Sequence, residues 1–403
     1  MEFSEMDSWF LPVGFRFCGL HSGIRPDPLR KDLALFFSDF PASAAGVFTT
    51  NKVKAAPVHL CKERLPSDLI RGIIVCSGNA NACTGKQGMA DARKMATVTA
   101  EVNKCEDKEI LVCSTGIIGR HLPMDVIEDG IRKTAKLLSD SAMSLSDAAH
   151  AILTTDTKIK VVTKEITING KQVVVAGVAK GAAMIGPNMA TMLAFVFTDA
   201  EASDGELASL ISDASDKSFN CVSVEGHTST NDSLIILANG ASGAGKMLGG
   251  DWDAFVAVVT EVCCELAKEI AIDAEGANHL VTITVEGLRD DKEAKKIAKT
   301  VAESVLVKTA IYGSDPNWGR VVSAAGYAGV NFEEKNLTLL MGEMTLYKDG
   351  TPMDFDPKVA SDYLKNNRNV TLRLIFNLGK GKCTYQTCDL TQEYVRLNAD
   401  YTT

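Results

Sequence analysis

The stretch KGAAMIGPNMATMLAFVFTDA, residues Lys180 to Ala200, decides how the middle of this chain folds and what chemistry it can carry. Gly186-Pro187-Asn188-Met189 predicts a constrained turn, because proline fixes its own φ and restricts the residue before it, while asparagine tolerates unusual backbone conformations. Met192 to Thr198 is an apolar, β-favouring run that predicts a core strand. Thr191 therefore stands at the start of a buried strand, directly after a tight turn.

A threonine in this position can cleave its own chain. Its hydroxyl can attack the carbonyl of Ala190, which converts the Ala190–Thr191 peptide bond into an ester, and hydrolysis of the ester leaves Thr191 as a new N-terminus. The new α-amine, with an ordinary pKa of about 7.7–8.0, can then serve as the base for the same hydroxyl. Taken alone, the turn and the strand fit the simpler interpretation of a loop that enters a buried strand.

Seven further segments, together with this one, resemble a known family along nearly the whole chain. They are GVFTTNKVKAAPV (46–58), SGNANACTGKQGMADAR (77–93), STGIIG (114–119), TTDT (154–157), TSTND (228–232), GSDPNWGR (313–320) and NADYTT (398–403). The order and content of these segments are similar to the arginine biosynthesis bifunctional proteins, the ornithine acetyltransferase (glutamate N-acetyltransferase) family of the cyclic arginine pathway. In that family a Thr after a PNMA run is the nucleophile.

The resemblance implies a self-processing acetyltransferase with a ping-pong mechanism. N2-acetylornithine would acylate Thr191 and release ornithine, and glutamate would then take the acetyl group as N-acetylglutamate. Some members also use acetyl-CoA as the donor, and the sequence leaves this open. The resemblance further implies an α fragment of residues 1–190 and a β fragment of residues 191–403, two of each per assembly, with no metal and no bound cofactor.

The same resemblance assigns the site residues. Thr115 and Gly116, in STGIIG, match the oxyanion pair, which stabilises the negative oxygen of the tetrahedral intermediate. Besides the nucleophile, five positions match the family's substrate-binding residues. The full set is Thr154, Lys180, Thr191, Glu275, Asn398 and Thr403.

The residues themselves give weaker support for these roles. A strand that ends in Thr115-Gly116 can offer a hydroxyl and a closely approaching amide, although such a strand end is usually structural. Lys180 lies beside Gly181-Ala182-Ala183 and can reach back to Thr191. We expect Glu275 at the end of a long helix, where a carboxylate is unfavourable unless a cation offsets the helix dipole. Asn398 and Thr403 belong to a terminal tail, which is usually disordered unless it is tied down.

The sequence departs from the family pattern in two places, and two other functional classes remain as alternatives. Ala182-Ala183 stands where Ser-Gly is more usual, which stiffens a loop near the cleavage site, removes a hydroxyl and leaves the efficiency of cleavage open. His227 stands where an Asp usually precedes TSTND. One alternative is an aminopeptidase or amidohydrolase of the related fold, with water as the acyl acceptor. The other is a non-enzymatic structural protein.

Alternating strand and helix patterns predict an α/β fold with mixed sheets. Apolar runs predict separate strands at 33–38 and 45–50, and Asn169-Gly170 predicts a hairpin between 158–168 and 171–179. The resemblance adds a layered αββα sandwich of the N-terminal-nucleophile style. We expect residues 191–278 to complete this main domain and about 279–403 to form a smaller C-terminal α/β domain.

Composition excludes several classes of function. The net charge of −9 disfavours nucleic-acid and membrane-surface binding, and no apolar run approaches the ~20 residues of a membrane span. Eleven cysteines without a CxxC pair, and an acidic N-terminus without a secretory signal, predict a cytoplasmic protein. The six histidines are scattered, which argues against a metal site.

Gly240–Lys246 resembles a phosphate-binding loop, but Met247 replaces the required Ser or Thr, so we expect a plain glycine-rich loop.

Overall fold

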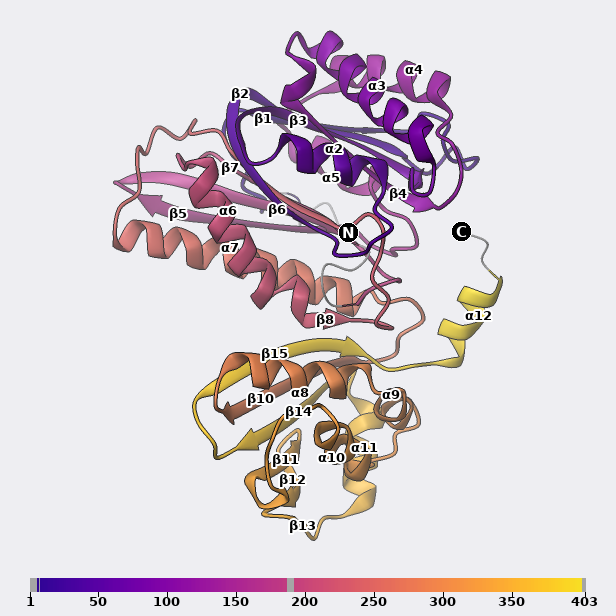
Figure 1. Ribbon diagram of the computed structural model, residues 1–403, viewed down its shortest axis with the longest axis vertical. Helices are drawn as coiled ribbons and strands as arrows, with labels where there is room; N and C mark the ends of the chain where they lie inside the picture. The colour runs from indigo at the N-terminus through magenta and orange to yellow at the C-terminus, as the bar shows by residue number, and fades with distance from the viewer. Residues whose placement is uncertain (1–5, 7, 187–191, 401–403) are drawn as a thin grey trace.

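Two mixed β-sheets with helices on their faces make up the fold (Figure 1). The computed structural model describes residue 6 and residues 8–186 and 192–400. Ala190, Thr191 and Thr403, to which the sequence assigns central roles, lie outside the described residues.

The first sheet has the strand order β4-β3-β2-β9-β7-β6-β5, and β1 pairs with β2 beside this path. The pairs β3–β4 and β7–β9 are parallel, and the other pairs are antiparallel. Its strands are β1 (Phe15–Leu20), β2 (Leu33–Phe48), β3 (Ser67–Asn79), β4 (Ile110–Ile117), β5 (Lys160–Ile168), β6 (Lys171–Lys180), β7 (Leu193–Thr198) and β9 (Ser233–Ala238).

This sheet folds over on itself because β2 is long and irregular at its centre. The register of β2 against β3 shifts between Phe37 and Ala42, where Pro41 interrupts the run. The first half of β2 pairs with β1 and β3, whereas the second half pairs with β9. The sequence interpretation of two separate strands here was wrong, because one strand serves both halves of the folded sheet.

Aromatic side chains fill the space between the two halves. The ring centroids of Phe36 and Phe195 are 5.2 Å apart, and those of Phe17 and Phe197 are 5.8 Å apart. All four rings are buried, and each such burial contributes about 1.5–3 kcal/mol of transfer free energy. The expected pair of stacked β layers is therefore present.

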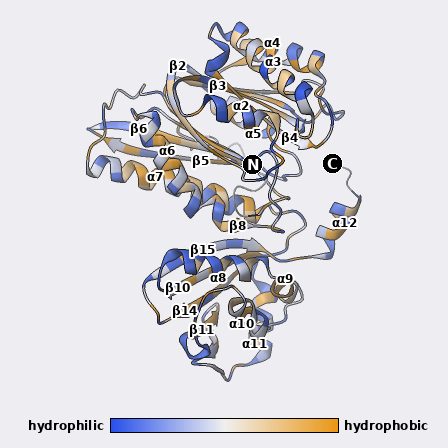
Figure 2. Ribbon diagram, viewed as in Figure 1, coloured by the Kyte–Doolittle hydropathy of each residue, from blue (hydrophilic) through white to orange (hydrophobic). Residues whose placement is uncertain are grey.

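Helices cover both outer faces of this pair of layers. On the β1–β4 side, α3 (Gly85–Asn103) and α4 (Met124–Leu137) bury Met95 and Ile127 against that half of the sheet. On the other side, α6 (Asp204–Lys217) packs against β2 and β9, and α7 (Gly250–Ile272) packs against β5 and β6. The hydrophilic faces of these helices point outward (Figure 2). Together the layers form the predicted αββα sandwich. Two shorter helices, α2 (Ala56–Arg64) and α5 (Ala142–Ala151), also belong to this part of the chain.

The second sheet has the order β13-β12-β11-β14-β10-β15-β8. Apart from β8, the strands of this sheet lie at or after Leu280 in the chain. The edge strand β8 comes from residues 222–223, before the long helix α7. Its strands are β8 (Val222–Ser223), β10 (Leu280–Leu288), β11 (Leu337–Met341), β12 (Met344–Lys348), β13 (Thr351–Pro352), β14 (Asn369–Phe376) and β15 (Gly381–Cys388). The accompanying helices are α8 (Asp291–Glu303), α9 (Val305–Tyr312), α10 (Trp318–Gly326) and α11 (Pro357–Asn366). The last helix, α12 (Gln392–Asp400), lies apart from this sheet (Figure 1).

Several other sequence predictions can be compared with this structure. The hairpin at Asn169-Gly170 is confirmed, since both residues have positive φ and Ile168 pairs with Lys171. The glycine-rich segment from Gly240 is a loop as expected, and Lys171 Nζ donates to the carbonyl of Gly243 within it. Among the described residues, no helix is both long enough and apolar enough to cross a membrane.

Candidate functional site

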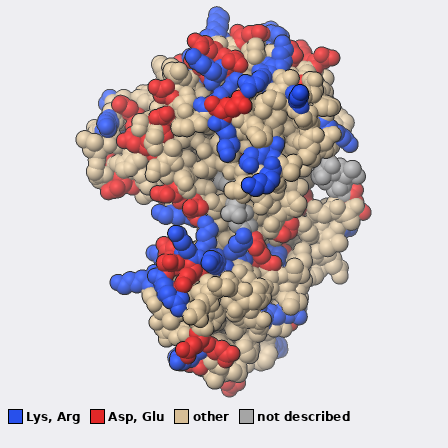
Figure 3. Space-filling model, in the orientation of Figure 1, with Lys and Arg blue, Asp and Glu red and all other residues tan. Residues whose placement is uncertain are grey.

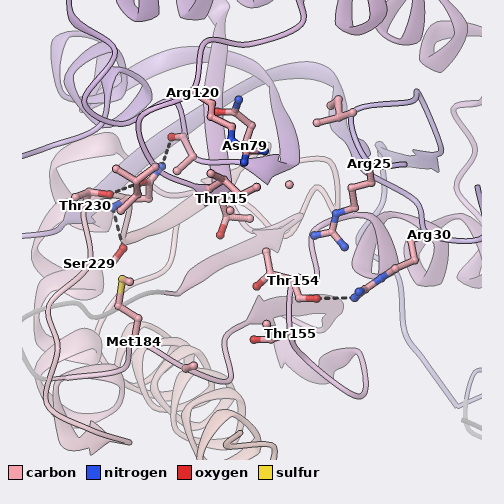
Figure 4. Close-up of a pocket in the computed structure, with 18 of the residues that line it drawn as sticks. Arg25, Arg30, Asn79, Thr115, Arg120, Thr154, Thr155, Met184, Ser229 and Thr230 are labelled. Carbon is pink, nitrogen blue, oxygen red and sulfur yellow. Dashed lines mark hydrogen bonds between the residues drawn. The ribbon is translucent and has the colours of Figure 1, made fainter. Parts of the chain in front are cut away.

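A cavity of about 620 Å³ opens where β3 and β4 end, beside the loop that follows α5 (Figure 4). Its walls come from parts of the chain that are far apart in sequence, from Ile24 to Asn398. Five of the residues that the sequence assigns to the site line this cavity: Thr115, Gly116, Thr154, Glu275 and Asn398.

Thr115 and Gly116 are held at the cavity by close pairing of two strands. Gly116 lies opposite Gly78 in the parallel pair β3–β4 and has φ +130°. A Cβ atom on Gly116 would lie 2.4 Å from the carbonyl carbon of Gly78, so no other residue fits without moving the strands. Thr115 is 97% buried and lines the cavity. The backbone at Thr115 and Gly116 is therefore held in place beside the cavity.

Hydrogen bonds from Asn231 also hold the end of β4 in place. Its Nδ2 donates to the carbonyl of Ala80 at 2.7 Å and to the carbonyl of Ser114 at 2.8 Å. The Ser114 hydroxyl also donates to Ala80, at 2.6 Å. Buried side-chain bonds of this kind fix backbone positions, and here they fix the residue just before Thr115.

Lys180 and Thr154 are in direct contact. Lys180 lies at the end of β6 and is 98% buried, and its Nζ donates to Thr154 Oγ1 at 2.7 Å. The Thr154 amide donates to Asp156, and the Thr154 carbonyl accepts from Arg30. Burial lowers the pKa of Lys180, and the nearby Asp156 only partly offsets this effect. Lys180 thus lies beneath the wall that carries Thr154.

Asp156 links this lysine to a buried network of charges. Its Oδ2 lies 3.8 Å from Lys180 Nζ, and its Oδ1 accepts from Lys160 Nζ at 2.8 Å and from the Gly181 amide at 2.6 Å. Lys160 also donates to Asp273 Oδ2 at 2.7 Å. Burial alone would raise the pKa of Asp156, but Lys180 and Lys160 outweigh burial and lower the pKa below its usual range. The network joins the Thr154 loop to the end of α7.

Replacing Asp156 should therefore destabilise the fold in a pH-dependent way. We expect Asp156→Asn to lose about 3–5 kcal/mol of unfolding free energy at pH 7, because two buried ammonium groups lose their shared partner. The lowered pKa of Asp156 means that its contribution is complete above about pH 4, its unfolded pKa, and is lost as the pH falls through the folded pKa. Urea titrations at pH 7 and pH 3 measure the difference, which should shrink at pH 3.

Asp39→Asn is the matched control, because Asp39 pairs with Arg16 at an exposed site. A surface pair contributes about 0–1 kcal/mol, so this variant should change little at either pH. Equal losses for the two variants at pH 7 would contradict the role given to the Asp156 network.

Glu275 and Asn398 meet at the other wall of the cavity. Asn398 Nδ2 donates to Glu275 Oε2 at 2.9 Å, and the Glu275 amide donates to the carbonyl of Ala182 at 2.9 Å. The sequence interpretation of Glu275 as the end of the long helix was wrong, and the terminal segment that carries Asn398 is tied down. The helix α7 ends at Ile272, and Asn398 lies on the helix α12, which Thr391 ties to Gly276 at 2.6 Å.

Thr191, the predicted nucleophile, lies outside the described residues, but the next residue in the chain is placed. Met192 is buried, immediately precedes β7, and donates its amide to Asp232 Oδ1 at 3.0 Å. Thr191 is bonded to this anchored residue.

Sequence reasoning missed several residues that build the site. Arg30 and Arg25 donate to the carbonyls of Thr154 and Leu153, and Asn231 fixes the end of β4 at Ser114. Asp156 lies within the TTDT segment, in which the sequence assigned a role to Thr154 alone. Nothing in the local pattern distinguishes these residues from ordinary surface arginines or loop residues, since their contacts span as many as 128 positions of the chain.

Charged side chains of both signs line this cavity. Over most of the face shown in Figure 3, acidic and basic side chains are interspersed. Three arginines, Arg25, Arg30 and Arg120, line the cavity together with the acidic residues Asp27 and Glu275. Charged groups of both signs therefore face the same space. Within the described residues, no group of three His, Cys, Asp or Glu side chains is arranged to hold a metal ion.

Comparisons with known proteins identify relatives along the whole chain. The ArgJ family model matches residues 16–403. The arginine biosynthesis bifunctional protein ArgJ 1 of a Nostoc species is 44% identical over 403 residues, covering 97% of each chain. ArgJ of Thermotoga neapolitana is 45% identical over 404 residues, covering 98% of this chain and 100% of its own. A crystal structure of ornithine acetyltransferase from Mycobacterium tuberculosis, complexed with ornithine, is 39% identical with a TM-score of 0.39, covering 44% of this chain and 92% of its own.

Proposed function

Because the chain belongs to the ArgJ family, we propose that it is an acetyltransferase of arginine biosynthesis that moves acetyl from N2-acetylornithine to glutamate. Thr191 Oγ attacks the acetyl carbonyl, ornithine leaves with its free amine, and Thr191 carries the acetyl group as an ester. The amine of glutamate then attacks the ester, which yields N-acetylglutamate and restores the hydroxyl. Both steps pass through a negatively charged tetrahedral intermediate.

One observation supports this proposal: Thr115, Gly116, Thr154, Glu275 and Asn398, which the family resemblance assigns to charge stabilisation and substrate binding, all line a single cavity. Thr115 and Gly116 are the oxyanion donors for the acetyl oxygen. Glu275, held by Asn398, faces the ammonium group of the substrate. Thr154, with Lys180 behind it, and the tail residue Thr403 complete the binding set.

The wider assembly follows from the same proposal. The chain cleaves itself between Ala190 and Thr191, and two α and two β fragments assemble in the cytoplasm. All eleven cysteines lie in the described part of the chain and are free thiols, which supports a reducing compartment. The chemistry requires no metal or bound cofactor, because the threonine hydroxyl itself carries the acyl group.

A transfer assay tests the proposed reaction directly. Purified protein is incubated with N2-[acetyl-¹⁴C]acetylornithine and glutamate, and the products are separated. Labelled N-acetylglutamate is the expected product, whereas labelled acetate alone would identify a hydrolase and no product would remove the enzymatic assignment. A parallel reaction with labelled acetyl-CoA and glutamate determines whether acetyl-CoA is a second donor.

Glu275→Gln should separate substrate binding from processing. The amide keeps the shape of the side chain but loses the charge, and a charge-assisted contact contributes about 1.5–3 kcal/mol, roughly a tenfold to hundredfold rise in KM. Self-cleavage occurs without substrate and should be unchanged. Initial rates against N2-acetylornithine, with a denaturing gel of the same preparation, measure both properties.

Glu269→Gln is the matched control, because Glu269 lies in the last turn of α7 and pairs with Lys158 at the surface. This variant should keep the wild-type KM. A Glu275→Gln protein that stays uncleaved would place Glu275 in the processing machinery, and an unchanged KM would leave it without a role in binding.

A further inference from the structure

Two cysteines lie against each other where the second sheet receives its edge strand from an earlier part of the chain. Cys221 ends a short 3₁₀ turn (Phe219–Cys221) just before β8, and Cys383 lies on β15, the strand with which β8 pairs (Figure 1). Their sulfur atoms are 3.9 Å apart, although 162 positions of the chain separate the two residues. Neither residue lines the cavity described above.

The backbone joint beside this pair is short. The strand β8 has two residues, which pair with Gln386 and Thr387 of β15. The chain before β8 forms α6, which covers the first sheet, whereas β15 lies inside the second sheet. A covalent bond between Cys221 and Cys383 would therefore tie the two sheets together beside this two-residue pairing.

The surroundings of the pair favour a thiolate, which is the form of cysteine that reacts with oxidants. The Cys221 thiol donates to the carbonyl of Asp216 at 3.2 Å, and Lys295 Nζ, on α8, donates to the same carbonyl at 2.9 Å. A hydrogen bond from Cys383 lowers the pKa of Cys221 against the effect of burial, and the charge of Lys295 acts in the same direction. An ammonium group thus lies beside the thiol that ionises first.

Access from solvent distinguishes this pair from another pair of neighbouring thiols. Cys61 and Cys113 also interact with each other, but their exposed fractions are 0% and 2%. Cys221 is buried, whereas Cys383 is partly exposed, so a small oxidant can reach the two sulfurs from the side of Cys383. The sulfurs must then approach from 3.9 Å to about 2.05 Å, which rotations of the two side chains can supply.

We propose that Cys221 and Cys383 form a redox site that closes into a disulfide when the protein meets a peroxide. The Cys221 thiolate attacks one oxygen of hydrogen peroxide, the oxygen–oxygen bond breaks, and the departing hydroxide takes up the proton that Cys221 lost. The Cys383 sulfur then attacks the sulfenic acid on Cys221, the sulfur–oxygen bond breaks, and the hydroxyl leaves as water with the Cys383 proton. Two thiols and one peroxide thus give one disulfide and two waters.

The disulfide should also stabilise the folded protein. It closes a loop that lies wholly within residues 191–403, so the proposed cleavage before Thr191 does not open this loop. Closing a long loop lowers the conformational entropy of the unfolded chain, and the oxidised protein should therefore melt several degrees above the reduced protein. In a reducing compartment the pair is a dithiol, and disulfides that form there are usually transient.

Peptide mapping of the purified protein tests the proposal. The protein is treated with hydrogen peroxide at neutral pH, its remaining thiols are alkylated, and it is digested without a reductant. We expect two peptides joined through Cys221 and Cys383, lighter than the free peptides by two hydrogen atoms and separated again by dithiothreitol. Calorimetry of the oxidised and reduced protein measures the rise in the melting midpoint.

Cys383→Ser removes one of the two sulfurs and should lose both the joined peptides and the rise in the melting midpoint. Cys264→Ser is the matched control, because Cys264 is an exposed thiol on α7 whose charge interacts with that of Cys221. This variant should keep both properties of the wild-type protein.

Peroxide that modifies only the exposed thiols Cys83 and Cys264, or a disulfide that joins Cys221 to Cys264, would overturn the proposal. A Cys221–Cys383 disulfide that leaves the melting midpoint unchanged would overturn its stabilising role. Mapping of the wild-type protein decides the pairing even if Cys383→Ser does not fold. None of these measurements uses acetyl transfer or self-cleavage, so this inference and the proposed function succeed or fail independently.

Discussion

Thr191→Ala is expected to remain a single chain of 403 residues and to transfer no acetyl group. Without the hydroxyl, nothing attacks the Ala190 carbonyl, so neither the ester nor the free α-amine can form. The same change removes the atom that would carry the acetyl group, so both functions fail together. A denaturing gel, intact-mass measurement and the labelled transfer assay record the result.

Thr191→Ser is the matched control, because serine retains a hydroxyl at the same position. It should be cleaved into residues 1–190 and 191–403, with Ser as the new N-terminus, and should retain measurable transfer. Wild-type enzyme that is fully active as one uncut band would contradict the processing mechanism. An active Thr191→Ala protein would contradict the identity of the nucleophile.

Thr115→Ala should lower turnover by about 10²–10³, the usual loss for one oxyanion donor. The hydroxyl acts on charge that develops in the transition state, so kcat should fall while KM changes little. Steady-state rates with N2-acetylornithine and glutamate measure the effect, and thermal melting checks the fold. Thr115→Ser, which keeps the hydroxyl, should recover most of the turnover.

Ser77→Ala is the structural counterpart of this variant. Ser77 lies opposite Thr115 in the β3–β4 pair and donates its hydroxyl to the carbonyl of Ala151 at 2.7 Å. Its loss leaves a buried acceptor without its partner and should cost about 1–3 kcal/mol of stability with little change in kcat. If Thr115→Ala behaved like Ser77→Ala, Thr115 would be a structural residue.

The local signals in the sequence predicted much of the fold. The hairpin at Asn169-Gly170 depends on neighbouring residues alone, and the structure confirms it. The apolar run after Thr191 was placed correctly as a buried strand, because its six described strand residues are all buried. The region from Leu33 to Phe48 was misread because Pro41 suggests a break, whereas pairing with β3 and β9 carries the strand through it.

The site was less accessible to sequence reasoning, because its contacts are long-range. Thr115, Thr154, Glu275 and Asn398 come from family resemblance, and only the fold brings them to one cavity. The partners that hold them give no local signal. The clearest case is the C-terminal segment, where Thr391 ties the helix that carries Asn398 to Gly276, a contact that no local pattern indicates.

The pairing of β6 with β7 has a consequence for how the processed protein unfolds. The two strands flank the proposed cut and remain joined by antiparallel pairing from Val175–Thr198 to Lys180–Leu193. Cleavage therefore converts a covalent connection into a contact between two polypeptides within one sheet. Unfolding of the mature protein becomes a dissociation, whose midpoint rises with protein concentration, whereas the uncut precursor melts at the same temperature at any dilution. Synthesis as one chain brings the two strands together at high effective concentration before that connection is removed.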